Sequence, residues 1–151
     1  MNNKIIPTLL FLSTVSYSQK DKKSEFIKSF FEDVFINDKP MNYMFEKYGE
    51  KKYHTVPQDS AIHWFSATVE GLKKEKSYLV NKDVVFTVEP YDDCSKPELR
   101  DFSAYGKKGR KKVFVVSVGD KIERYVFTKN SKITSFDYVY KGENGHVRFI
   151  Y

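Results

Sequence analysis

The sequence predicts an α+β protein in which three helices come first and an antiparallel sheet follows. Up to about Lys76, apolar residues recur at helical spacing, whereas beyond Lys82 they alternate with polar residues at the period of a strand. Helices and strands that occupy separate halves of a chain are typical of an α+β fold, because a doubly wound parallel sheet would interleave them.

Residues 1–18 are predicted to be a secretory signal peptide. Lys4 gives a short positively charged start, and an apolar run from Ile5 to about Val15 follows. Ser16 and Ser18 supply the small residues of an A-x-A-like cleavage site. The run is shorter than the roughly 20 apolar residues that span a bilayer. The alternative is a buried N-terminal helix or strand.

Residues 19–151 are therefore expected to form one domain that is secreted or periplasmic after cleavage between Ser18 and Gln19. Their number suits a single compact domain. Cys94 is the only cysteine in the chain, so no internal disulfide can form in an oxidising compartment. The domain must then be held together by its core.

Three helices are expected in the first half of this domain. The first runs from about Ser24, a good N-cap, to Asn37 and carries a phenylalanine-rich face. A short second helix begins at Pro40 and stops at Gly49. The third opens at Pro57 and runs to about Lys74, with an apolar stripe of Ala61, Ile62, Phe65, Val69 and Leu72.

About five strands are expected in the second half, four of them in a meander. Two of these strands are joined by Gly119-Asp120, a two-residue hairpin signal with glycine first. A long irregular stretch from Tyr91 to about Arg110 precedes the meander, and connections inside a compact domain are usually shorter. The expected strands are Val84–Glu89, Val113–Val118, Ile122–Thr128, Ile133–Tyr140 and His146–Tyr151.

A sheet of this size must hide one face, and the three amphipathic helices are the available cover. Helices packed into the concave face of a curved sheet are therefore expected. In this element order and in its strand Asn130–Phe136, the chain resembles the NTF2-like superfamily, particularly its small exported members of unassigned function. The resemblance implies a cone-shaped fold with a concave pocket. Residues 51–56 leave little room for the strand pair that many relatives have there, and a cystatin-like arrangement is the rival fold.

The densest charge feature is a basic run of Lys107, Lys108, Arg110, Lys111 and Lys112. Clustered cations can bind anionic polymers by displacing their counterions. They also keep a turn and a strand edge soluble. Because acidic residues flank the run and an exported protein rarely meets nucleic acid, a solvated turn is expected and no nucleic-acid partner.

Neither a cofactor nor a metal ion is expected from the acids, the cysteine and the histidines. Asp92 and Asp93 are adjacent, so in an extended chain they point to opposite sides. Cys94 could act as a nucleophile only with a histidine close in space. His54 and His63 match no zinc-ligand spacing.

A pocket is the functional interpretation of several polar and aromatic side chains. Strand Ile133–Tyr140 is expected to place Phe136, Tyr138 and Tyr140 on one face and Asp137 on the other. Most of the aromatic residues are expected to pack in the core, and a tyrosine-rich ligand cavity is the alternative. The candidate ligand-binding residues are His63, Trp64, Tyr91, Asp92, Asp137 and Tyr138.

The expected function is that of a non-enzymatic module of the cell envelope that binds a small ligand or a partner protein. One alternative is an enzyme similar to NTF2-like isomerases and dehydratases, with a buried Asp137 or Asp92 as general base. A second alternative is a secreted inhibitor or immunity protein that makes contact through the Tyr91–Arg110 stretch.

Overall fold

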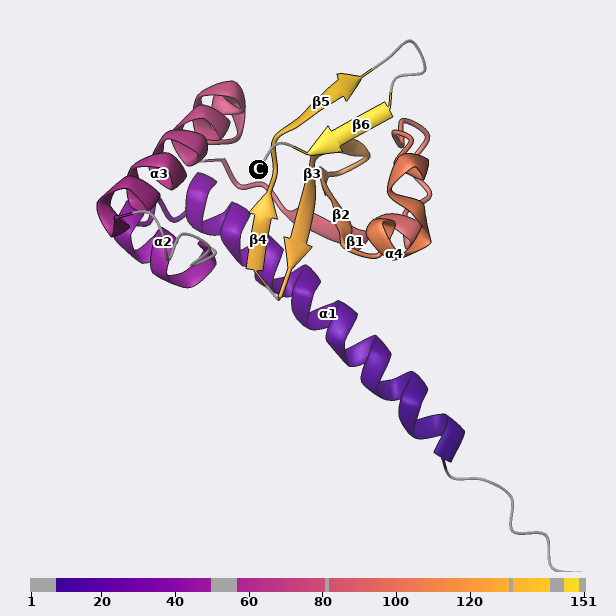
Figure 1. Cartoon of the computed structure of the whole chain (residues 1–151). Helices are drawn as coiled ribbons and strands as arrows, with labels where there is room; N and C mark the ends of the chain where they lie inside the picture. Colours follow the sequence, from indigo (N-terminus) through magenta and orange to yellow (C-terminus); the bar gives the residue numbers. More distant parts are fainter. Residues whose placement is uncertain (1–7, 50–56, 81, 131, 142–145, 150–151) are drawn as a thin grey trace, which may run out of the picture.

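The computed structural model describes residues 8–49, 57–80, 82–130, 132–141 and 146–149 (Figure 1). Within these residues the α+β class is confirmed, because helices come first and antiparallel strands follow. Some predictions fall outside the described residues: His54, the stretch 51–56, the turn 142–145 and the last two residues of the final strand.

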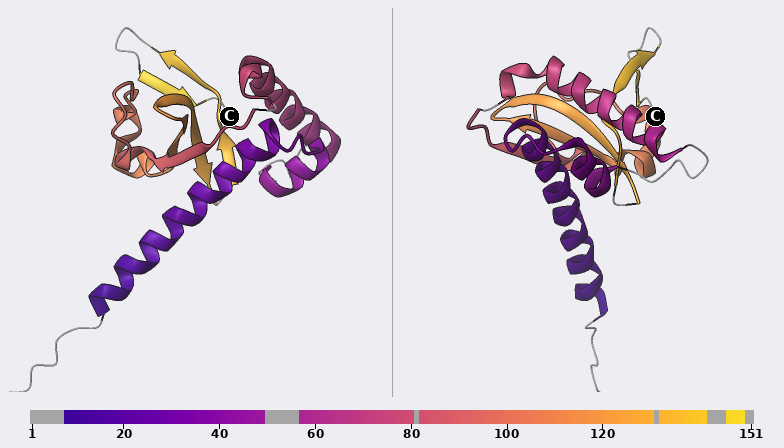
Figure 2. Two further views of the ribbon diagram at one scale, coloured as in Figure 1. Left: turned by 180° about the vertical axis from the view of Figure 1, so that it is seen from behind. Right: turned by 90° about the vertical axis from the view of Figure 1, so that its left-hand side faces the viewer.

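Helix α1, Thr8–Phe35, begins earlier than the predicted helix and ends close to the predicted stop. Its C-terminal half packs against the sheet, while its N-terminal half projects beyond it (Figure 2). After Phe35 the chain turns, and Asp38 has a φ of 47°. No helix of the described part of the chain is both long and apolar enough to cross a membrane.

Helices α2, Met41–Tyr48, and α3, Gln58–Glu75, lie beside the C-terminal end of α1 (Figure 1). A buried carboxylate, Asp33, ties α1 to α2: it accepts hydrogen bonds from the Tyr48 hydroxyl at 2.6 Å and from Lys47 Nζ at 3.0 Å. Burial alone raises the pKa of Asp33, but these hydrogen bonds and one from Asn37 lower it below its usual value.

Four antiparallel strands form the main sheet in the order β1-β2-β3-β4. They are β1 Phe86–Pro90, β2 Val113–Val118, β3 Lys121–Lys129 and β4 Lys132–Ser135. The predicted strand Ile133–Tyr140 is broken after Ser135, and its second part joins a separate hairpin of β5 Tyr138–Lys141 and β6 His146–Phe149.

The predicted hairpin at Gly119-Asp120 is confirmed. Val118 pairs with Lys121, which leaves two residues in the turn between β2 and β3. Gly119 has a φ of 56°, a conformation that an L side chain rarely adopts.

Both faces of the main sheet are buried, whereas only one covered face was expected. The helices cover one face with a group that we call the helix core, which includes Ile27, Phe30, Phe31, Val34, Leu72, Phe86, Phe114, Val116, Val126 and Phe136. The opposite face carries a second group, the aromatic cluster: Tyr91, Cys94, Leu99, Phe102, Tyr105, Val113, Val115, Ile122, Tyr125, Phe127, Tyr138 and Phe149.

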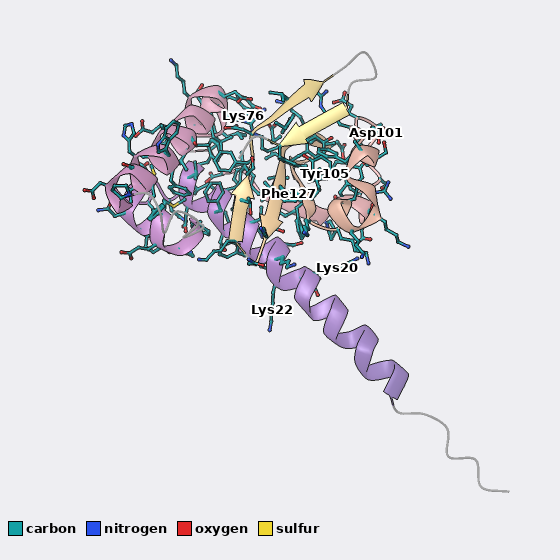
Figure 3. All side chains as sticks on the ribbon, viewed as in Figure 1. Lys20, Lys22, Lys76, Asp101, Tyr105 and Phe127 are labelled. Carbon is teal, nitrogen blue, oxygen red and sulfur yellow. The ribbon has the colours of Figure 1, made fainter. Side chains whose placement is uncertain are left out.

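The segment between β1 and β2 is the second cover. It holds three short helices, η2 Tyr91–Asp93, η3 Ser103–Tyr105 and α4 Gly106–Arg110. Figure 3 shows Tyr105 of this segment beside Phe127 of β3, and their ring centroids lie 5.9 Å apart. The continuous apolar run of β2 is typical of a strand that is buried on both faces.

Candidate functional site

The C-terminal end of α3 meets β3 at two adjacent residues of opposite charge, Glu123 and Arg124. Val116 of β2 pairs with Arg124 and Ser117 pairs with Ile122, so Glu123 is the extra residue of a β-bulge. A bulge changes the direction of the side chains around it and is common next to functional sites. Here it allows both charged side chains to reach the end of the same helix.

Glu123 is the centre of the first half of this site. Its side chain is 2% exposed, and it lies 3.3 Å from Lys76 Nζ and 3.3 Å from Lys121 Nζ. The Tyr78 hydroxyl, from the short helix η1 Ser77–Leu79, donates a hydrogen bond to its Oε2. Burial by itself raises the pKa of Glu123, but Tyr78 and the two ammonium groups hold that pKa below its usual value.

Arg124 is the centre of the second half. It forms a bidentate pair with Glu75, with Nη1–Oε1 at 3.1 Å and Nη2–Oε2 at 2.8 Å. Nη2 also lies 3.2 Å from Asp137 Oδ1, and the guanidinium group lies 5.7 Å from the ring centroid of Tyr138. One arginine thus joins the end of α3 to the break between β4 and β5.

Asp137 has a higher affinity for its proton than an ordinary aspartate. Burial raises its pKa, Arg124 opposes that shift, and the negative charge of Glu75 adds to it. Asp137 is nevertheless half-buried and ion-paired. It therefore has the raised pKa of a candidate base while its carboxylate is already held by a cation.

We call this set the charged cluster: Glu75, Lys76, Tyr78, Lys121, Glu123, Arg124 and Asp137. Its three carboxylates and three cations balance, and each carboxylate contacts at least one cation. Figure 3 shows Lys76 at the end of α3 that approaches the strands. The cluster fastens α3 to both sheets, and its buried charges are already paired with one another.

The aromatic cluster holds Tyr91 and Tyr138, two of the predicted ligand-binding residues. The Tyr91 hydroxyl donates to the Arg100 carbonyl at 2.8 Å, and its ring lies 5.2 Å from Phe102 in an edge-on contact. Tyr138 packs edge-on against Tyr125 at 5.6 Å. These rings pack against one another, as expected for a core. Burial raises the pKa of Tyr125.

The adjacent acids of the Tyr91–Arg110 stretch point to different partners. Asp92 Oδ1 lies 3.1 Å from Arg110 Nε, so one member of the basic run is held by an acid. Asp93 Oδ2 lies 2.9 Å from Lys20 Nζ of α1. The described residues hold no group of three histidine, cysteine, aspartate or glutamate side chains placed to bind a metal ion.

His63 and Trp64 lie apart from both clusters, on an exposed part of α3. The Trp64 side chain is 68% exposed, whereas its neighbour Phe65 packs against Phe45 at 5.5 Å between ring centroids. The other four cations of the basic run are exposed at α4 and just after it: Lys107, Lys108, Lys111 and Lys112.

The structure does not bring the six predicted ligand-binding residues together at one site. Tyr91 and Tyr138 both lie in the aromatic cluster, Asp137 pairs with Arg124, and Asp92 pairs with Arg110. His63 and Trp64 stay on the exposed part of α3. Sequence reasoning missed Glu123 and Arg124. Their adjacency was the available signal, because regular alternation would place one of two neighbouring charges on each face of the strand.

Comparison with known proteins finds no family model, no curated protein and no solved structure that matches this chain. The resemblance to the NTF2-like superfamily stays a prediction.

Proposed function

We propose that this chain is an exported, non-enzymatic binding protein of the cell envelope and that it recognises a partner protein. The observation that carries this proposal is that both acids that could serve as a general base are ion-paired with an arginine. Asp92 is paired with Arg110, and Asp137 is paired with Arg124. A base must accept a proton from a substrate within hydrogen-bond reach, and an arginine at that position competes with the substrate.

The exposed surface of α3 is the best candidate for the contact with the partner. Trp64 is the most exposed aromatic side chain among the large apolar residues of the described surface. Tryptophan is enriched among residues that dominate binding energy, because one side chain buries a large area at low entropic cost. The Tyr91–Arg110 stretch is less suited to this role, since Tyr91, Phe102 and Tyr105 are turned into the aromatic cluster.

One observation favours the enzymatic alternative, namely the raised pKa of Asp137. A carboxyl group that holds its proton more tightly is a better general base at neutral pH. The alternative requires a carbonyl-type substrate beside Asp137 that displaces Arg124. Asp137→Asn would then abolish turnover while leaving the fold intact.

The test uses a photo-reactive phenylalanine analogue placed at one position in the full chain and expressed in its native cells. With the analogue at position 64, we expect a single cross-linked species of constant mass after illumination. Position 104, exposed in η3, is the matched control and should give none. The proposal fails if position 64 gives no adduct, or if the protein turns over a carbonyl substrate and Asp137→Asn abolishes that activity.

A further inference from the structure

We propose that the surface around Trp64 binds a second copy of this chain, with two α3 helices packed antiparallel around a two-fold axis. This inference rests on the proposed function and names the partner. The first observation is Trp64 itself, which leaves most of a large apolar side chain in water.

Gly71 is the second observation. It follows Trp64 by seven residues, which places it about 20° away around the helix and roughly 10 Å further along the axis. A Cβ added at Gly71 would meet no atom within 4 Å, and Gly71 is not among the glycines with positive φ. Glycine inside a helix is less favourable than alanine, and within the described residues no contact requires glycine at this position. A second helix packed closely against this face would use the space that the missing side chain leaves.

Symmetry connects the two observations. In an antiparallel pair whose two-fold axis passes beside Ala67 and Thr68, the Trp64 ring of each copy lies over Gly71 of the other. A two-fold interface must be self-complementary in this way, because each contact occurs twice. Ala67 is small and exposed, so the two helix axes can approach to the usual distance of about 8–10 Å.

Charge selects the antiparallel arrangement. Asp59 lies in the first turn of α3 and Lys74 in the last turn, and both are exposed. An antiparallel pair brings Lys74 of each copy to the Asp59 end of the other. A parallel pair would instead place like charges side by side. The helix dipoles also favour opposite directions.

The experiment follows self-association of the full chain, purified as the cell produces it. Trp64 is the only tryptophan, so its emission reports on this surface alone. With rising concentration, sedimentation velocity should show a monomer–dimer equilibrium. The emission should move to shorter wavelength, and a neutral quencher should reach the ring less well.

Two sets of variants test the geometry. Gly71→Glu should weaken dimerisation at least tenfold, while Ala104→Glu adds the same charge to an exposed site on the second cover and should leave it unchanged. Asp59→Lys or Lys74→Glu alone should raise the dissociation constant of the dimer several-fold. The double variant should restore the original dissociation constant, because both intermolecular ion pairs are then reversed together. Circular dichroism checks that each variant folds.

A chain that stays monomeric up to about 1 mM overturns the inference. So does a dimer that Gly71→Glu leaves intact, or a charge-swapped double variant no better than its parents. If the chain is monomeric but position 64 still cross-links to a different protein, the proposed function stands and the two-fold pairing fails.

Discussion

Glu123 shows how a buried charge is stabilised in this fold. The bulge in β3 turns its side chain toward the end of α3, where Lys76, Lys121 and Tyr78 surround it. Leaving such a carboxylate without its partners would cost several kcal/mol, because an isolated charge is poorly solvated inside a protein. The pairing therefore holds the end of α3 and the helix η1 against β3.

Glu123→Gln should remove part of the dependence of stability on pH. The pKa of Glu123 is lowered in the folded state, so ionised Glu123 stabilises the fold above the unfolded pKa of about 4.5. That contribution is lost as the pH falls through the folded pKa. In denaturant unfolding, we expect the variant to be less stable than the wild type at pH 7 and the difference to shrink below about pH 4.

Asp137→Asn is the matched control, because its stability relative to the wild type should change with pH in the opposite direction. The pKa of Asp137 is raised by burial, so the wild type loses stability as the pH rises from the unfolded pKa through the folded one. The Asn variant should therefore gain stability relative to the wild type as the pH rises. If the difference in unfolding free energy between Glu123→Gln and the wild type stayed constant with pH, the lowered pKa assigned to Glu123 would be wrong.

At the scale of elements, the segment between β1 and β2 matters most. It was predicted as a long irregular stretch, and it is instead the cover of one sheet face. Phe102 is fully buried in it, and its ring lies 4.9 Å from Tyr125 and 5.5 Å from Phe149. The segment therefore contributes to the core of the domain, and the exposed lysines of the basic run lie in α4 and just after it.

Phe102→Ala should destabilise the protein by about 3–5 kcal/mol, as large as the effect of Phe30→Ala in the helix core. Both side chains have no exposed surface, so each truncation leaves a cavity. Lys108→Ala, an exposed substitution in the same segment as Phe102, should change the free energy of unfolding by no more than about 0.5 kcal/mol. The measurement is urea unfolding; a harmless Phe102→Ala would mean that the segment is not a structural cover.

For the whole molecule, we expect cleavage of the signal peptide to decide which part of α1 the mature protein keeps. We expect the exported protein to begin at Gln19, which removes the first part of α1 and leaves the portion whose side chains pack against the sheet. Intact-mass spectrometry of the protein recovered outside the cytoplasm tests this. Ser18→Tyr should block cleavage, whereas Tyr17→Ser should not, because the cleavage site requires small residues on either side of position 17. Recovery of an exported chain that retains residues 1–18 would contradict the prediction.

The sequence by itself determined the class of fold and most of its elements. Helices at 41–48 and 58–75, the strands Val113–Val118 and Lys121–Lys129, and the Gly119 turn all follow from local periodicity and turn chemistry. These features depend on residues that are close in the chain. A short stretch of sequence therefore determines which face of a helix is apolar and which type of tight turn forms.

Only the tertiary structure decided where the strand Ile133–Tyr140 breaks and which residues meet. Phe136 packs in the helix core and Tyr138 in the aromatic cluster, so the prediction that they share one face was wrong. The extra residue at Glu123 likewise interrupts the alternation of β3. Arg124 and Glu75 are 49 residues apart, and their pairing depends on where the C-terminal end of α3 meets β3. Local patterns cannot specify such contacts, because they arise from the packing of whole elements.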